Sequence, residues 1–301
     1  MAQSASRALA PAPSPAAVLE LLKPITWFPP MWAFGCGAIS AGLVFDGGWL
    51  VVAAGILLAG PLLCANSQAI NDWFDRHVDA INEPQRPIPS GRIAGRWGLV
   101  IAVAGSALSL TVAAALGPWV LLWASIGLLL SWGYSAPPVR LKRNGWWGNA
   151  AVGLSYEGLA WITGASVVAG ALPDAPILLV ALLYSAGAHG IMTLNDFKSI
   201  AGDRRMGIGS LPVRLGPRRA AQTACLMMAL PQAVVVGLLA YWAQPWHAGI
   251  VALLLAVQLL LMRHFLAQPA ERALWYSAVG VNFFVLGMLV AALALRNAAA
   301  A

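Results

Sequence analysis

Residues 97–116 read WGLVIAVAGSALSLTVAAAL, a stretch that contains no charged side chain. At a rise of about 1.5 Å per residue, a helix of this length spans roughly 30 Å, which is the thickness of the hydrocarbon core of a membrane. Because no water is present there to satisfy backbone amides, such a spanning segment must be an α-helix. The stretch therefore predicts an all-α membrane protein.

The same character extends over the whole chain of 301 residues, in which 60% of the residues are hydrophobic and 10% are charged. The mean hydropathy is +0.74, a value that an ordinary soluble domain does not reach because its core cannot hide so much apolar surface. We therefore predict one membrane domain over residues 23–301, after a disordered tail over residues 1–22. Its nine transmembrane helices are expected near residues 26–45, 50–70, 97–116, 119–135, 149–169, 176–195, 220–243, 248–266 and 275–295.

The positions of the basic residues test this arrangement. The net charge of +7 comes from short clusters between apolar runs rather than from one patch, which argues against nucleic acid as a partner. With nine spans, all Lys and Arg residues except Arg296 fall on the N-terminal side of the membrane. Cytoplasmic loops are enriched in Lys and Arg, so we expect the N-terminus and these loops to face the cytoplasm.

Two acidic segments interrupt the apolar pattern. They read NDWFDRHVD at residues 71–79 and NDFKSIAGD at residues 195–203, an offset of 124 residues. Together with Glu83 they hold six of the eleven Asp and Glu residues. Each closes a predicted span on the same side of the membrane, so we expect the two segments to meet at one site, as in membrane proteins built from two similar halves.

The spacing within each segment favours a cation site. If the helices continue past the membrane boundary, Asn71, Asp75 and Asp79 share one face, because residues four apart are neighbours on a helix. Asn195, Ser199 and Asp203 have the same spacing. Carboxylates gathered on one face repel each other unless cations lie among them, and Mg²⁺ binds one or two carboxylates together with phosphate oxygens of a substrate. We therefore predict Mg²⁺ and a diphosphate between the two segments.

Other interpretations of the charged residues stay open. The acids could simply lie at helix ends and pair with arginines. One acidic segment alone would fit this interpretation, but two matched segments on the same side of the membrane argue against it. The nearby basic residues could hold diphosphate oxygens, Arg in bidentate contact and Lys as a point charge; they are Arg86, Arg140, Lys142, Lys198 and Arg204. Glu157 and His189 lie inside predicted spans, where ionisable groups contact either a substrate or a neighbouring helix.

These motif segments resemble the UbiA superfamily of intramembrane prenyltransferases, whose first signature has the form NDxxDxxxD. The resemblance is strongest to its tetrapyrrole branch, the chlorophyll and bacteriochlorophyll synthases, and in particular to the bacterial members. It runs from about Lys23 to Ala294. The segments that carry it are ITWFPPMW at 25–32, residues 71–91, YSAPPVRLKRNGW at 134–146, residues 195–203 and SLPV at 210–213.

This resemblance implies helices arranged around a central cavity and a Mg²⁺-dependent reaction in a bacterial photosynthetic membrane. The reaction would transfer a geranylgeranyl or phytyl group from its diphosphate to the propionate of bacteriochlorophyllide a. By position, metal and diphosphate binding are assigned to Asn71, Asp72, Asp75, Asp79, Asn195, Asp196 and Asp203, with Arg86 and Lys142 as diphosphate contacts. Many superfamily members have an acid or Tyr where Ser199 stands. Glu157 and His189 remain the candidates for contact with the tetrapyrrole.

Several alternatives remain. The acceptor could instead be chlorophyllide a or an aromatic ring such as a quinone precursor. A transporter would have its acids near the middle of broken helices, whereas these acids lie at helix ends. A scaffold that binds pigment without catalysis would hold a tetrapyrrole and release no diphosphate.

Overall fold

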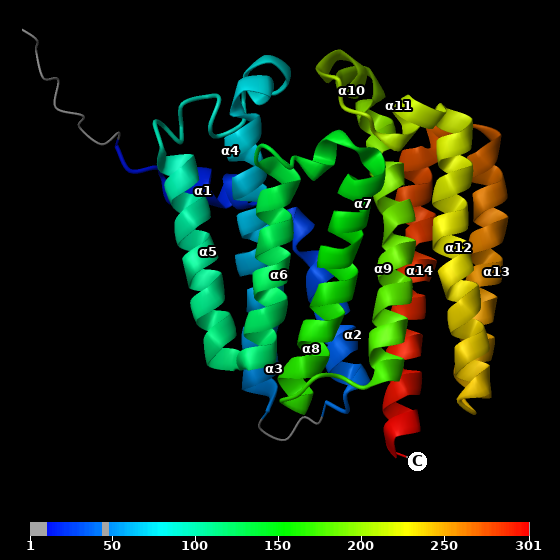
Figure 1. Cartoon of the computed structure of the whole chain (residues 1–301). Helices are drawn as coiled ribbons and strands as arrows, with labels where there is room; N and C mark the ends of the chain where they lie inside the picture. The colour runs from blue at the N-terminus through cyan, green and yellow to red at the C-terminus, as the bar shows by residue number, and fades with distance from the viewer. Residues whose placement is uncertain (1–10, 44–47, 301) are drawn as a thin grey trace, which may run out of the picture.

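A computed structural model describes residues 11–43 and 48–300. In this part of the chain every regular element is a helix, and long helices run side by side between two ends of a bundle (Figure 1). The all-α prediction is confirmed.

The first half of the chain contains α1 (Pro15–Leu22), α2 (Phe28–Ser40), α3 (Trp49–Leu57), α4 (Ala65–Asn82), α5 (Trp97–Leu116), α6 (Pro118–Ser135), α7 (Gly145–Gly153) and α8 (Ala160–Ala169). The second half contains α9 (Ala175–Asp196), α10 (Ile200–Met206), α11 (Leu211–Leu215), α12 (Pro217–Tyr241), α13 (Pro245–Ala267) and α14 (Pro269–Ala300). Several of these helices begin at a proline, whose fixed φ and missing N–H suit the first helical position.

Two of the long helices contain a π-helical segment. η2 (Leu58–Cys64) joins α3 to α4, and η4 (Leu154–Leu159) joins α7 to α8. Pro61 lies within η2 and cannot donate a backbone hydrogen bond, which disturbs the regular ladder at that point. α3, η2 and α4 therefore form one helix over Trp49–Asn82, long enough to cross a membrane and carry the first acidic segment at its end.

The predicted number of spans is not confirmed. Among the described residues, six helical stretches are long and apolar enough to cross a membrane: Trp49–Asn82, Trp97–Leu116, Ala175–Met206, Pro217–Tyr241, Pro245–Ala267 and Pro269–Ala298. The other three predicted spans also fall on helices. However, α2 has only 13 residues, and α6 and the helix formed by α7, η4 and α8 are rich in Gly, Ser and Trp, which lowers their hydropathy.

The structure differs from the prediction in the N-terminal region. Residues 1–10 of the predicted tail lie outside the described residues, but Pro15–Leu22 form α1. The Ser14 side chain caps this helix by accepting a hydrogen bond of 3.3 Å from the backbone N–H of Ala17. Ala17 and Leu21 are buried in an apolar cluster with residues of α4. α1 is thereby fixed beside the helix that carries the first acidic segment.

α2 and α8 pack in backbone contact. A Cβ atom on Gly37 would lie 1.9 Å from the carbonyl oxygen of Trp161, and one on Gly164 would lie 2.0 Å from that of Phe34. In a membrane, where lipid is as apolar as the side chains, helices associate through such close approach at small residues.

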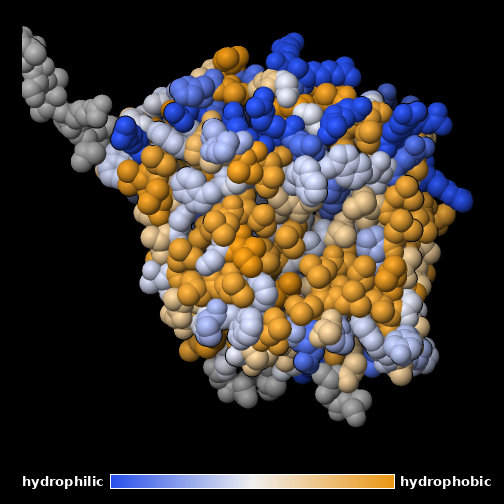
Figure 2. All heavy atoms as spheres, in the orientation of Figure 1, coloured by the Kyte–Doolittle hydropathy of each residue, from blue (hydrophilic) through white to orange (hydrophobic). Residues whose placement is uncertain are grey.

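Polar residues gather at one end of the bundle, above a broad apolar belt (Figure 2). This end carries the connections that follow α4, α6 and α9 (Figure 1). Two of these connections are joined by backbone hydrogen bonds: Gly145 N–H donates to Gly209 O at 2.8 Å, and Gly209 N–H donates to Arg143 O at 3.0 Å. The segment before α7 is thus tied to the segment before α11.

Candidate active site

A cavity of about 770 Å³ lies at the polar end of the bundle, and both acidic segments contribute to its wall. Asp75 and Asp79 reach it from α4, while Asp196 ends α9 and Asp203 comes from α10. The other predicted site residues that line it are Asn71, Arg86, Arg140, Lys142, Lys198 and Ser199. Segments more than 100 residues apart therefore share one site, as the sequence predicts.

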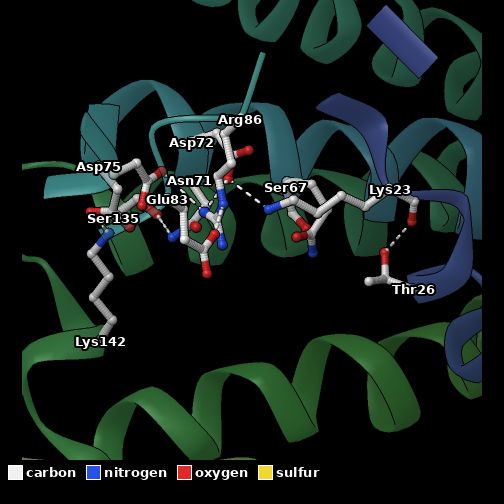
Figure 3. Close-up of polar contacts among 12 residues, drawn as sticks. Lys23, Thr26, Ser67, Asn71, Asp72, Asp75, Glu83, Arg86, Ser135 and Lys142 are labelled. Atoms are coloured by element: carbon white, nitrogen blue, oxygen red, sulfur yellow. Dashed lines mark hydrogen bonds and ion pairs between the residues drawn. The ribbon is translucent and has the colours of Figure 1, made fainter. Parts of the chain in front are cut away.

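The first acidic segment is already paired with protein cations. α4 stays helical to Asn82, so Asn71, Asp75 and Asp79 share one face as expected. Lys142 Nζ lies 2.5 Å from Asp75 Oδ1 (Figure 3). Arg86 Nη1 lies 3.0 Å from Asp79 Oδ2. Any ligand that binds these carboxylates must compete with, or reuse, the two cations.

The two cations differ in how firmly they hold their protons. Burial lowers the pKa of the Lys142 ammonium, and the neighbouring Asp75 only partly offsets this effect. Burial also opposes the charge of Arg86, but the surrounding carboxylates Asp72, Asp79 and Glu83 outweigh it and raise the pKa of the guanidinium. Arg86 is therefore a fixed charge at the rim of the site.

Asp72 faces away from this cavity, although the motif predicts it as a metal ligand. Its side chain is 1% exposed, and its Oδ1 atom accepts a hydrogen bond of 2.7 Å from Lys23 Nζ and one of 3.4 Å from Arg86 Nη1. It is not among the described residues that line the cavity. The structure thus separates Asp72 from the other acids of the motif and connects it to the N-terminal region.

Of the predicted common face of Asn195, Ser199 and Asp203, the structure brings Ser199 and Asp203 together in the cavity but not Asn195. α9 ends at Asp196, and a 3₁₀ turn over Phe197–Ser199 precedes α10. Because a 3₁₀ turn rotates successive residues by more than an α-helix does, the spacing of four no longer aligns Asn195 with Ser199. Asn195 lines a neighbouring cavity of about 350 Å³ instead.

The acids of the second segment have neutral partners. Asp196 Oδ2 accepts a hydrogen bond of 3.0 Å from Asn149 Nδ2, and Asp203 Oδ2 accepts bonds of 2.9 Å from Ser199 Oγ and 2.6 Å from Ser210 Oγ. No salt bridge to either carboxylate occurs within residues 11–43 and 48–300. The negative charge of this half of the site is therefore the less compensated one.

The donor set fits Mg²⁺ only if a substrate completes it. In the described part of the chain, no three His, Cys, Asp or Glu side chains gather closely enough to hold an ion alone. Mg²⁺ commonly takes one or two carboxylates and fills its remaining positions with water and substrate phosphate oxygens. Asp196 and Asp203, with oxygen atoms facing a cavity of about 770 Å³, suit this mode of binding.

Besides Asp72 and Asn195, three further predicted residues do not line the cavity that the structure describes. Arg204 is exposed on α10 and is not part of its lining. His189 is buried, with its ring centroid 5.2 Å from that of Trp146. Glu157 is buried within η4.

The structure also adds residues that the sequence analysis did not assign to the site. Tyr134, Asn149 and Ser210 line the cavity, and Lys23 reaches Asp72 from behind it. Asn149 could have been found, because an amide at the start of a predicted span needs a polar partner. Lys23 gave no such signal, since 49 residues separate it from Asp72.

The sequence matches a family model and curated relatives over most of its length. The model of the UbiA prenyltransferase family matches residues 26–287. The bacteriochlorophyll synthase 33 kDa chain of Cereibacter sphaeroides is 56% identical over 285 residues, covering 95% of this chain and 94% of the relative. The chloroplastic chlorophyll synthase of Oryza sativa is 40% identical, covering 92% of this chain and 76% of the relative.

Solved structures share the fold. A structure described for digeranylgeranylglyceryl phosphate synthase superposes with a TM-score of 0.73 at 22% identity, covering 92% of this chain and 98% of the other. A UbiA homologue from Archaeoglobus fulgidus bound to GPP and Mg²⁺ gives a TM-score of 0.65 at 22% identity, covering 94% and 98%.

Proposed function

This chain belongs to the UbiA prenyltransferase family and is a polytopic membrane prenyltransferase, and we propose that its acceptor is the propionate of bacteriochlorophyllide a. The donor is a geranylgeranyl or phytyl diphosphate, and the product is the corresponding ester. The observation that carries this proposal is that one cavity is lined by four carboxylates from both acidic segments together with Arg86, Lys142 and Lys198. Its acceptor rests on the 56% identity to a bacteriochlorophyll synthase chain.

The roles of the residues follow from their charges. Asp75, Asp79, Asp196 and Asp203 would hold Mg²⁺, which when bound supplies positive charge to the departing diphosphate. Arg86 can grip phosphate oxygens with two parallel N–H groups, whereas Lys142 offers a compact point charge. Both cations already lie at the carboxylates, so a diphosphate that enters the cavity meets positive charge without a large rearrangement.

Attack by the acceptor requires no catalytic base from the protein. A propionate with an ordinary carboxyl pKa of about 4 is an anion at neutral pH, so no side chain has to remove a proton before it attacks the first carbon of the prenyl group. The C–O bond forms at that carbon, and the bond from carbon to the diphosphate oxygen breaks. The protein must align the two groups and keep water from the electron-poor carbon.

We place the polar end of the bundle at the cytoplasmic face of a bacterial photosynthetic membrane, because 17 of the 18 Lys and Arg residues lie on the predicted N-terminal side. Water-soluble prenyl diphosphate headgroups would then reach the acids directly. Labelling of a cysteine introduced at Arg205, in sealed membranes of known orientation, tests this placement.

The acceptor is tested with bacteriochlorophyllide a and its propionate methyl ester, each supplied with Mg²⁺ and geranylgeranyl diphosphate. We expect prenylated pigment and diphosphate release from the free acid and neither from the methyl ester. A prenylated product that still carries the methyl group would contradict attack by the carboxylate. Chlorophyllide a and an aromatic quinone precursor, assayed in parallel, distinguish the other acceptors.

A further inference from the structure

The cavity of about 770 Å³ that the four carboxylates line is here called the acidic cavity. One face of α6 lines this cavity and two further cavities in the interior of the bundle. Tyr134 lines both the acidic cavity and the neighbouring cavity of about 350 Å³. Ser131 lines that second cavity and a third, narrow one, which Gly127 and Trp123 also line. These four residues are spaced by three or four positions, so they lie above one another on a single helix face.

The opposite wall has the same continuity. Ser67 at the start of α4, and Ser155 and Tyr156 in η4, line both the second and the third cavity. Ala59 and Leu63 of η2 also line the third cavity, so both π-helical segments flank it. Because the three cavities share lining residues, they adjoin one another, and their volumes fall from about 770 Å³ through about 350 Å³ to about 40 Å³.

The volume of the third cavity limits which groups can enter it. A volume of about 40 Å³ holds about three water-sized groups at 10–15 Å³ each. A tetrapyrrole ring cannot enter it, whereas the branched end of a prenyl chain can. Pro30, Ala59, Leu63 and Leu159 give this part an apolar wall, which suits a hydrocarbon.

The length of the route matches a long prenyl chain. At about 1.5 Å per residue, Trp123 lies about 16 Å from Tyr134 along α6, and Gly127 lies about 10 Å from it. With C–C bonds of about 1.5 Å, an extended geranylgeranyl chain measures roughly 19 Å and a geranyl chain roughly 9 Å. The shorter chain ends above Gly127, and the longer one must pass it.

We propose that Gly127 and Trp123 determine which length of prenyl chain the enzyme accepts. Gly127 admits the chain to the narrow cavity, and Trp123 closes the far end. This inference rests on the proposed function, because it takes the donor to be a prenyl diphosphate held by the acidic cavity.

The surroundings of both residues support these roles. A Cβ atom on Gly127 would find its nearest neighbour, Leu159 Cδ1, at 3.9 Å, so a larger side chain there extends into the open space. Trp123 is held in place by a hydrogen bond of 3.0 Å from its Nε1 atom to Ser166 Oγ and by stacking on Trp119. A fixed indole can act as a stop, whereas a mobile side chain would yield to the chain end.

The test compares geranyl, farnesyl and geranylgeranyl diphosphates with the same acceptor. Gly127→Leu is expected to keep at least half of the geranyl transfer rate and to lose at least tenfold with geranylgeranyl diphosphate. Gly127→Ala should change both rates by less than threefold, because its methyl group makes only ordinary contact. Leu129→Phe is the matched control, since Leu129 lies on the same helix with 73% of its surface exposed.

Trp123→Leu tests the other end of the route. It should raise the rate with a donor one isoprene unit longer than geranylgeranyl, relative to the geranylgeranyl rate, by at least threefold. Equal losses with all donors in Gly127→Leu, or unchanged length preference in both variants, would overturn the inference. A wild-type enzyme that transfers none of the chains would instead refute the proposed function, so the two failures are distinguishable.

Discussion

The ammonium of Lys23 lies 2.7 Å from Asp72 Oδ1, although 49 residues separate the two in the chain (Figure 3). Lys23 directly follows α1, and Arg86 approaches the same carboxylate oxygen at 3.4 Å. Arg86 and Arg92 both lie in the loop that follows α4. A second contact joins this loop to α1, because Arg92 forms an ion pair with Glu20. Asp72 is therefore a positioning residue that ties the N-terminal region to the loop carrying Arg86.

Replacement of Asp72 by Asn should lower the turnover without changing the Mg²⁺ concentration needed for half-maximal rate. The reason is that the carboxylate orients Lys23 and Arg86 behind the cavity and does not face it. A Mg²⁺ titration of the variant measures this. Glu20→Gln is the control, since the ion pair of Glu20 with Arg92 is exposed to solvent and such pairs contribute little. A raised Mg²⁺ requirement in Asp72→Asn would show direct metal binding.

Asp79→Asn and Asp203→Asn should each reduce the turnover by at least 100-fold, because each removes a carboxylate that neutralises charge at the diphosphate. Ser199→Ala should be much milder. The Ser199 hydroxyl donates to Asp203 at 2.9 Å, but Ser210 also donates to the same oxygen at 2.6 Å. Rates at limiting and saturating Mg²⁺ check all three variants. Wild-type rates in the two Asp variants at limiting Mg²⁺ would refute their role as ligands.

Lys142→Met should raise the KM for the prenyl diphosphate by about tenfold or more, the effect of losing about 1.4 kcal/mol of binding free energy. Arg204→Met is the matched control and should change KM by less than twofold, because Arg204 is exposed outside the cavity lining. Initial rates over a range of donor concentrations measure both. Equal effects in the two variants would mean that general surface charge, rather than a contact in the cavity, attracts the donor.

Gly37→Ala and Gly164→Ala should each lower the free energy of unfolding by about 1–3 kcal/mol. The added methyl group would overlap a backbone carbonyl of the facing helix, α8 or α2. Gly35→Ala is the control on the same helix as Gly37. A methyl group at Gly35 would have no neighbouring atom within 4 Å, so this change should be neutral. Thermal unfolding in detergent compares the three. Equal melting temperatures would show that the helices separate easily at this point.

The sequence predicts the membrane fold and the meeting of the two acidic segments because both follow from local patterns. Hydropathy identifies the apolar helices, and a continuous helix places Asp75 and Asp79 on one face. The 3₁₀ turn after Asp196 has no comparable signature, so the orientation of Asn195 could not be foreseen. The contact of Lys23 with Asp72 depends on how α1 packs against α4, which is a property of the tertiary structure alone.

The paired hydrogen bonds between Gly209 and the 143–145 backbone have a mechanical consequence. They couple the loop that bears Lys142 to the loop that follows Asp203, so a displacement of one carries the other with it. The backbone segments that carry Lys142 and Asp203, which both line the cavity, are thereby linked. We therefore expect the two loops to move as one unit, so that amide hydrogen exchange at Gly145 and Gly209 slows together when a prenyl diphosphate binds.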